Sequence, residues 1–411
     1  MDRVVNETAP RPLSGVRVID VGVWHAGPGG AAILGDLGAE VIKIEGLGGD
    51  VERYNGTLGP VSTDEVNTDD WTVLFDISNR NKRGIAVDLN SAAGREIVLR
   101  LAADADVFIT NMKRSTVKKL GIDYETLKAV NERLVHVNVT GFGSEGPLAD
   151  SGAMDTLGQA MAGMMYLRGG EDPASLQALI LDQLTAIVAS NAAVTGLLAR
   201  ELHGFGQDVH VSLYGSATWL MHPNLVAASV LGRDFSLKWD RTNPPITRTT
   251  YRCADGKWMV GTNHPEDKYW PTFMQTLGLP ELVDDDRFAT AARRRENKGE
   301  LFAIVDERFA QKPRDEWLAA FADARLLMAP VHSFTDVLND PQAQANGYVK
   351  PFAHPMLGEL PLPGFPMRFG KQEAGIHAGA PALGEHTDDV LRSAGYDDEA
   401  LADLRERAVI K

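Results

Sequence analysis

A group of cations is the first feature of this otherwise acidic chain that could do chemistry. Four basic residues follow the strand-like run 106–110 at close spacing: Lys113, Arg114, Lys118 and Lys119. If that run belongs to a parallel sheet, the group lies at the carboxyl edge of the sheet, where ligands of such folds bind. We expect these cations to bind the phosphates of a ligand. The alternative is a solvated helix face.

A glycine-rich segment, 27–32, reads GPGGAA and fits the G-x-G-x-x-A pattern of dinucleotide-binding folds. Glu45 ends the next strand-like run, near the place where a ribose-binding acid is expected. Two details oppose an NAD site: residues 21–26 separate the first strand from the first glycine, and Pro28 lacks an N–H that a pyrophosphate would use. We favour a small-residue helix packed closely on the sheet, with an NAD-dependent dehydrogenase as an alternative.

Strands and helices that would position these residues alternate over the first 140 residues. Strands are expected at 16–20, 40–44, 84–89, 106–110 and 134–139, and helices at 31–37, 92–101 and 123–130. A buried helix at 179–202 and a strand at 207–213 follow. The alternation predicts an α/β fold with an open parallel, Rossmann-like sheet covered on both faces. A hairpin turning at Asp255-Gly256 and amphipathic helices at 301–309 and 315–321 indicate a smaller α+β domain.

Composition narrows the class of protein. The 411 residues include 41 Lys+Arg against 56 Asp+Glu, a net charge of −15, which argues against binding to nucleic acid or an anionic membrane. The single cysteine, Cys253, excludes an intrachain disulfide and fits a reducing cytoplasm. The first residues lack the apolar core of a signal peptide, and we expect no membrane-spanning stretch. A cytoplasmic enzyme is predicted.

Motifs spread in order along nearly the whole chain resemble family III CoA-transferases, the CaiB/BaiF family. They lie at 12–20 (PLSGVRVID), 26–28 (AGP), 37–45 (LGAEVIKIE) with Gly49-Asp50 and Arg53, 81–89 (NKRGIAVDL), 105–107 (ADV) with Asn111, 340–342 (DPQ) and 383–391 (LGEHTDDVL). The resemblance implies a large domain built from both chain ends (1–225 and 331–411) and a small inserted domain (226–330). It also implies an interlocked homodimer.

The resemblance further implies a covalent mechanism for moving CoA from an acyl-CoA donor to a carboxylic acid acceptor. The nucleophile of the family falls on Asp172, in the turn 169–173 that follows the loop Gly141-Phe142-Gly143. It would pass through an aspartyl mixed anhydride and an aspartyl-CoA thioester. Glu171 and then Asp155 are the alternative nucleophiles. No metal and no tightly bound cofactor are expected, because the CoA thioester itself is the substrate.

Carried over in the same way, the CoA contacts of the family fall on three groups of residues, each at or just after the end of a strand. They are His25 and Ala26; Val87, Leu89 and Asn90; and Asn111, Met112, Lys113 and Lys119, with Thr140 before the Gly141 loop. Trp24, Tyr166 and Trp219 are candidates for an acyl pocket, although aromatic residues are more often part of a core.

Two other interpretations share the CoA site. In the related α-methylacyl-CoA racemases a His precedes the Asp at position 155, and a second acid–base residue corresponds to Asp182. Here Met154 replaces that His, and Met carries no proton, so a transferase is favoured over a racemase. The alternative that is not an enzyme is a non-catalytic CoA-binding protein.

Overall fold

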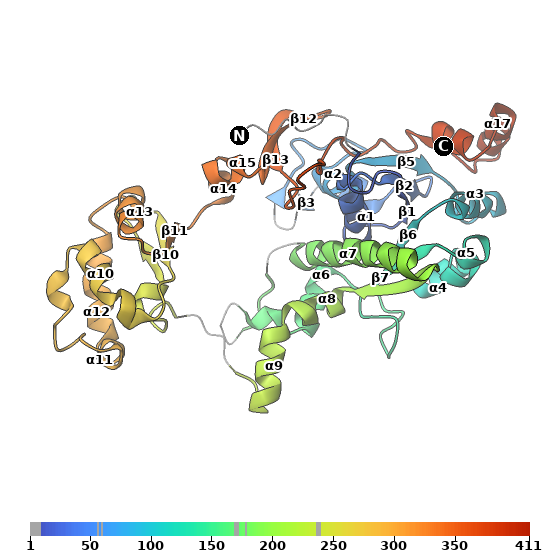
Figure 1. Cartoon of the computed structure of the whole chain (residues 1–411). Coiled ribbons are helices and arrows are strands. Elements are labelled where there is room, and N and C mark those ends of the chain that lie inside the picture. Colours follow the sequence, from blue (N-terminus) through green and yellow to red (C-terminus); the bar gives the residue numbers. More distant parts are fainter. Residues whose placement is uncertain (1–9, 56, 59–60, 168–171, 177–178, 236–239) are drawn as a thin grey trace. The chain divides into compact units, whose positions relative to one another are not determined.

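The computed structural model describes residues 10–55, 57–58, 61–167, 172–176, 179–235 and 240–411 (Figure 1). These residues form two compact units. Among the described residues, the first unit is made up of those within 10–167, 172–235 and 347–411, and the second of residues 240–346. The small domain was expected at 226–330. In the structure β11 (Met328–Pro330) pairs with the predicted hairpin. The second unit continues to Asn346 and so includes two short helices that follow residue 330, at Phe334–Leu338 and Pro341–Ala345.

A six-stranded parallel sheet forms the centre of the first unit, as predicted. Its strand order is β5 (Lys82–Ala86), β2 (Glu40–Glu45), β1 (Arg17–Val21), β6 (Val107–Thr110), β7 (Val135–Thr140) and β8 (Gln207–Ser212). In the register, Val18 pairs with Val41 on one side and with Val107 on the other. Within each strand, successive side chains point to opposite faces of the sheet.

Each face of the sheet packs into its own apolar core. Ile19 and Phe108 belong to the core on one side, and Val18 and Val107 to the core on the other. The first core includes residues of α3 (Ala92–Ala103), α4 (Arg114–Leu120), α5 (Tyr124–Val130), α16 (Thr387–Ser393) and α17 (Asp398–Glu406). The second includes residues of α1 (Ala26–Asp36), α7 (Ile180–His203) and α8 (Leu213–Leu220).

Helix α1 begins five residues earlier than predicted, at Ala26 rather than Ala31. The glycine-rich segment therefore lies within the helix and not in a phosphate-binding turn. A Cβ at Gly29 would lie 3.1 Å from the Cβ of Ala186, and one at Gly30 would lie 3.0 Å from that of Ala189. The small residues thus permit close packing, as expected, and the partner they approach most closely is α7.

The C-terminal segment completes the first unit, because it is joined to the edge strand β5. Gly84 donates its N–H to His386 Nδ1 at 3.2 Å and accepts the N–H of His386 at 2.9 Å. Val87 forms an isolated antiparallel bridge with Ile410. The motif at 383–391 therefore has a structural role, which is to attach the chain end to the sheet.

The predicted hairpin is present in the second unit, as β9 (Thr250–Arg252) and β10 (Trp258–Gly261). Tyr251, Phe309 and Phe321 lie in its buried core. The helices of this unit are α10 (Glu266–Leu277), α11 (Ala291–Glu296), α12 (Lys298–Phe309), α13 (Arg314–Asp323), α14 (Phe334–Leu338) and α15 (Pro341–Ala345).

The remaining helices and strands of the first unit include a pair missed in the proline-containing tail, β12 (Val349–His354) and β13 (Gly358–Pro363). The others are β3 (Thr57–Leu58), β4 (Val61–Ser62), α2 (Val73–Asn79), α6 (Asp155–Met161) and α9 (His222–Leu231). By length and composition α7 could cross a membrane, against the expectation that the chain holds no such stretch. One side of α7 is buried against α1 and the sheet, a pattern that core helices of globular folds also show.

Candidate active site

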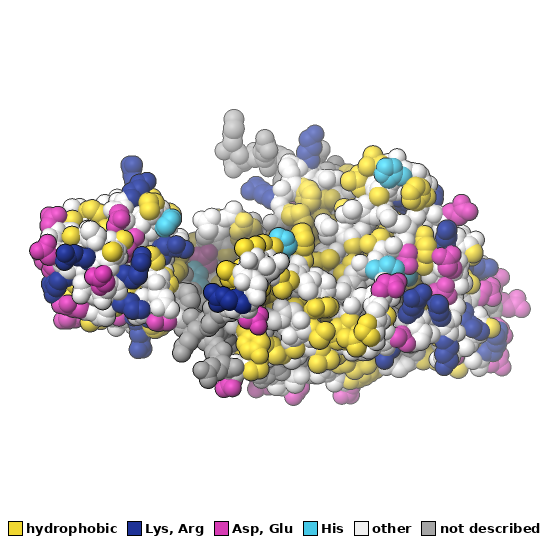
Figure 2. Space-filling view, turned by 90° about the horizontal axis from the view of Figure 1, so that it is seen from below, with side chains coloured by type: hydrophobic (Ala, Val, Ile, Leu, Met, Phe, Trp, Pro, Cys, Tyr) yellow, Lys and Arg dark blue, Asp and Glu magenta, His cyan; other side chains and the backbone are white. Residues whose placement is uncertain are grey.

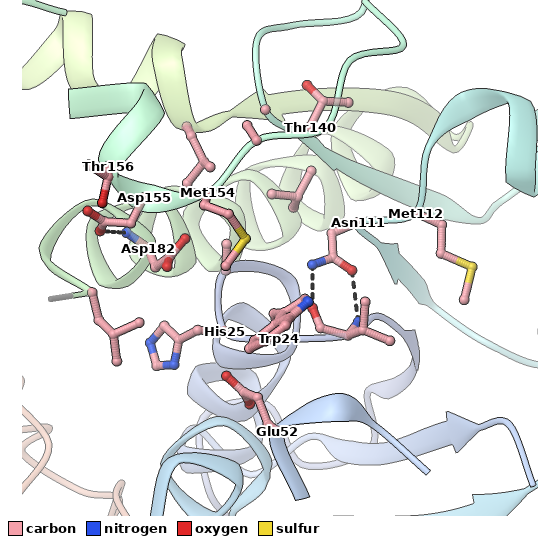
Figure 3. A pocket seen from close by; sticks show the side chains of 18 of the residues that line it. Trp24, His25, Glu52, Asn111, Met112, Thr140, Met154, Asp155, Thr156 and Asp182 are labelled. Carbon is pink, nitrogen blue, oxygen red and sulfur yellow. Dashed lines mark hydrogen bonds between the residues drawn. The ribbon is translucent and has the colours of Figure 1, made fainter. Parts of the chain in front are cut away.

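A cavity of about 660 Å³ opens in the first unit at the carboxyl ends of β1, β6 and β7. Residues 23–26 line it after β1, 111–114 line it after β6, and Thr140 and Gly141 line it at the end of β7. Met154, Asp155 and Thr156 contribute from the start of α6, and Asp182 from the first turn of α7 (Figure 3). This edge of the sheet is where open α/β folds bind their ligands.

The cavity brings together six of the residues predicted to contact CoA: His25, Ala26, Asn111, Met112, Lys113 and Thr140. Four others do not line it. The side chains of Val87 and Leu89 are buried in the apolar core, and Asn90 and Lys119 are exposed elsewhere. Of the basic group, Lys113 and Arg114 line the cavity, whereas Lys118 and Lys119 do not. Lys113 and Arg114 stand at the start of α4, which meets the cavity, whereas Lys118 and Lys119 lie in its last turn, and the sequence could not show which end of the helix faces the cavity.

Asn111 fastens the loop after β1 to the loop after β6. Its Oδ1 accepts the N–H of Val23 at 2.9 Å, and its Nδ2 donates to the carbonyl of Val23 at 2.5 Å (Figure 3). Next to this contact, Trp24 has a φ of 60°, in the left-handed region that a bulky residue rarely occupies. The N–H of Trp24 donates to Asp50 Oδ1 at 3.2 Å. These contacts hold a strained turn in the wall of the cavity.

His25 is buried, and both of its ring nitrogens have partners. Nε2 lies 2.8 Å from Gln183 Oε1, and Nδ1 lies 2.8 Å from Ser78 Oγ. Because the amide oxygen only accepts, Nε2 carries the proton and Nδ1 accepts from the serine hydroxyl. Burial lowers the pKa of His25 to about 4, so the ring is neutral at pH 7. His25 therefore adds no positive charge to the site.

A buried network of ion pairs supports the floor of the cavity, and its members come from the family-like motifs. Lys43 Nζ lies 2.8 Å from Asp50 Oδ2, and Arg53 donates two hydrogen bonds of 2.8 Å to Glu45. Lys82 Nζ lies 2.7 Å from Asp20 Oδ2. These pairs position the 3₁₀ turn at Val51–Tyr54, which carries Glu52. Glu45 is thus paired with an arginine, which opposes a role as a ribose ligand.

Asp155 and Asp182 form a pair of carboxyl groups on one wall of the cavity. Both oxygens of Asp155 have partners: Oδ1 accepts from Gln159, and Oδ2 accepts the backbone N–H groups of Leu181 and Asp182. Burial, followed by the negative charge of Asp155, raises the pKa of Asp182 to about 7. At neutral pH Asp182 is therefore partly protonated and can donate or accept a proton, whereas the oxygens of Asp155 are engaged as hydrogen-bond acceptors.

Asp172 is exposed and does not line the cavity. It lies in a short described stretch, 172–176, whose later residues Ser175 and Leu176 do line the cavity. The alternative nucleophile Glu171 lies outside the described residues. Of the aromatic candidates, Trp24 lines the cavity, whereas Tyr166 and Trp219 are exposed.

Sequence reasoning missed Glu52 and Gln183. Glu52 lines the cavity although its side chain is fully buried, and Gln183 holds the ring of His25. Neither residue belongs to a catalytic motif. Glu52 stands next to the motif residues Asp50 and Arg53, and that proximity was the one available signal.

Comparison with known proteins shows the family to which the chain belongs. The model of CoA-transferase family III matches residues 13–387. The chain belongs to CoA-transferase family III. Within this family it is 31% identical to succinyl-CoA:glutarate CoA-transferase of Mus musculus, covering 98% of this chain and 91% of that protein. It is 29% identical to (R)-2-hydroxy-4-methylpentanoate CoA-transferase of Clostridioides difficile, covering 97% and 99%.

A solved structure agrees with this assignment. The crystal structure of a CaiB/BaiF family protein from Brucella suis superposes with a TM-score of 0.82 at 30% identity, covering 94% of this chain and all of that one. The family resemblance inferred from the motifs is therefore confirmed, together with the mixed α/β fold and its parallel sheet. As a family III CoA-transferase, the chain is an enzyme, and CoA thioesters are the substrates of such enzymes.

Proposed function

We propose that the enzyme moves CoA from an acyl-CoA donor to a carboxylic acid acceptor through a covalent aspartyl intermediate. The observation that carries this proposal is the cavity at the sheet edge, where residues expected to contact CoA converge with three carboxyl groups, those of Glu52, Asp155 and Asp182. Lys113 and Arg114 at its rim suit the phosphates, and its inner wall suits the acyl group.

Asp172 is the proposed nucleophile because the family resemblance places the nucleophile there, and Ser175 and Leu176 of the same short stretch line the cavity. The Asp172 carboxylate attacks the thioester carbon, the C–S bond breaks, and CoA leaves as the thiolate with the bonding electrons. The thiolate then attacks the aspartyl carbonyl of the mixed anhydride and releases the donor acid, which leaves an aspartyl-CoA thioester. The carboxylate of the acceptor repeats these steps in reverse and regenerates the aspartate. Water must be excluded throughout, because the anhydride hydrolyses readily.

Intact-protein mass spectrometry after incubation with a panel of acyl-CoAs tests this mechanism. We expect an adduct that hydroxylamine removes and that peptide mapping places on Asp172. The matched variants Asp172→Asn, Asp155→Asn and Asp182→Asn show which of these three aspartates carries the adduct. Loss of the adduct in Asp155→Asn or Asp182→Asn, but not in Asp172→Asn, would transfer the nucleophilic role to the cavity wall.

The carboxyl pair Asp155 and Asp182 supports a second candidate, an acyl-CoA racemase. Exchange of an α-proton requires two acid–base groups in one cavity, and the pKa of one of this pair, Asp182, is raised to about 7. Met154, which also lines the cavity, stands where the racemases carry a His and cannot take a proton. Exchange of the α-proton with deuterated water, without any covalent adduct, would favour the racemase.

We also propose that the enzyme is a cytoplasmic homodimer of the interlocked kind. Large apolar side chains are exposed on α7, α8 and α9, including Leu198, Trp219 (75% exposed) and Val230 (81%). Figure 2 shows hydrophobic side chains gathered on the face of the molecule that it presents. Exposed apolar side chains gathered on one face support a protein interface there. Light scattering after gel filtration should give about twice the chain mass of 44.6 kDa; a monomer would contradict the proposal.

A further inference from the structure

Glu52 lies in the floor of the cavity, next to the buried network of ion pairs. Among the described residues of this floor, it is the one carboxyl group that the network leaves without a partner. Its side chain is 0% exposed, and neither Oε1 nor Oε2 has a hydrogen-bond partner there. Its neighbours differ: Asp50 binds Lys43, and Glu45 binds Arg53. Buried polar groups are almost always paired, and an exception calls for a missing partner.

The surroundings of Glu52 favour its neutral form. It is close in sequence to Asp50, which is already paired with Lys43. The other buried lysine, Lys82, is paired with Asp20. Burial, followed by the charge of Asp50, raises the pKa of Glu52 to about 8, and the positive charges of Lys43 and Lys82 act in the opposite direction. At pH 7 the group is therefore a carboxylic acid, with one O–H to donate.

The carboxyl group of Glu52 lies at the wall of the cavity, where its O–H can meet a ligand. Glu52 is one of the residues that line the cavity, and Figure 3 shows its carboxyl group pointing toward the side where His25 and Trp24 lie. Both ring nitrogens of His25 are already engaged. The basic residues that line the cavity, Lys113 and Arg114, belong to the other wall, after β6. An anionic group that enters beside His25 therefore meets Glu52 as its donor.

We propose that Glu52 binds the second, non-reacting carboxylate of a dicarboxylic acid substrate through its protonated carboxyl group. A carboxylic acid that donates to a carboxylate forms a short, charge-assisted O–H···O⁻ hydrogen bond. A rotation of the Glu52 side chain into the cavity it already lines brings the O–H to the ligand. A monocarboxylic acid of equal length leaves the buried group without a partner, so the site selects against it.

This inference rests on the proposed CoA transfer, and equilibrium binding tests it separately from transfer. The full chain, saturated with CoA, is titrated at pH 7 with glutarate and with pentanoate, which share a five-carbon chain. We expect glutarate to bind at least tenfold more tightly than pentanoate. Glu52→Leu should reduce this preference to within about twofold. Glu52→Gln should keep it, because the amide still donates. Glu65→Leu, an exposed control outside the cavity, should behave as the wild type.

A pH series provides the second measurement, and it does not depend on the leucine variant being folded. Between pH 7 and pH 9.5 the wild type should lose its preference for glutarate as Glu52 ionises, whereas Glu52→Gln should retain it. A wild type without the preference, an unchanged preference in a folded Glu52→Leu, or equal pH profiles in wild type and Glu52→Gln would each overturn the inference. Failure of the wild type to transfer CoA to any acid would instead overturn the proposed function.

Discussion

Asp155 Oδ2 accepts the backbone N–H of Leu181, 26 residues later in the chain, at 2.8 Å. A carboxylate at the start of a helix usually caps its own helix. The structure instead places Met154 at the N-cap of α6 and directs Asp155 to the N-terminus of α7. Asp155 thus connects the two helices that form one wall of the cavity.

Removing this connection should destabilise the fold. Asp155→Ala eliminates an acceptor for two N–H groups of α7, those of Leu181 and Asp182, and we expect a loss of about 2–3 kcal/mol in the free energy of unfolding. Urea denaturation measures the change. Asp397→Ala, which removes a single exposed cap from α17, should cost about 1 kcal/mol. Equal losses in the two variants would contradict the bridging role of Asp155.

Stability should depend on pH through Asp182. Its folded pKa of about 7 is higher than its unfolded value, so Asp182 contributes stability at low pH that is lost as the pH rises through about 7. The difference in unfolding free energy between Asp182→Asn and wild type should shift in favour of the variant by about 1–3 kcal/mol from pH 5 to pH 8. Denaturation curves across this range measure it. A difference that is independent of pH would show that Asp182 ionises normally.

The two halves of the basic group should differ in their effect on CoA affinity. Lys113→Gln and Arg114→Gln alter side chains that line the cavity, and each should weaken CoA binding about tenfold, an effect of about 1.4 kcal/mol. Lys118→Gln and Lys119→Gln, on the same helix but outside the cavity, are matched controls and should change it less than twofold. Calorimetric titration compares the four variants, and a larger effect at Lys119 would favour the contact implied by family resemblance.

The close contact between α1 and α7 should not accept a larger residue. Gly30→Val introduces a branched side chain where even a Cβ would lie 3.0 Å from Ala189, so we expect a cost of about 2 kcal/mol or more. Gly299→Ala is the control, since Gly299 in α12 has open space around it and alanine is the better helix former; it should raise stability by up to about 1 kcal/mol. Thermal unfolding of both variants tests the contrast.

Local sequence patterns determined the elements of this protein and their order. The apolar runs around Ile19, Ile42 and Phe108 predicted central strands, because a parallel strand buried on both faces must be apolar along its length. The ordered motifs indicated the family, and strand ends followed by polar residues such as Asn111 located the ligand edge. These features depend on neighbours in the chain, so the chain alone could show them.

Tertiary structure decided which side chains share an environment. Glu52 reads as an ordinary surface glutamate in a charged turn, and it is buried without a partner only because Lys43 and Lys82 are bound by other acids. Asp155 caps α7 rather than α6 because its neighbour in space comes from 26 residues away. Burial and charge pairing act through space, and the position of a residue in the chain does not encode them directly.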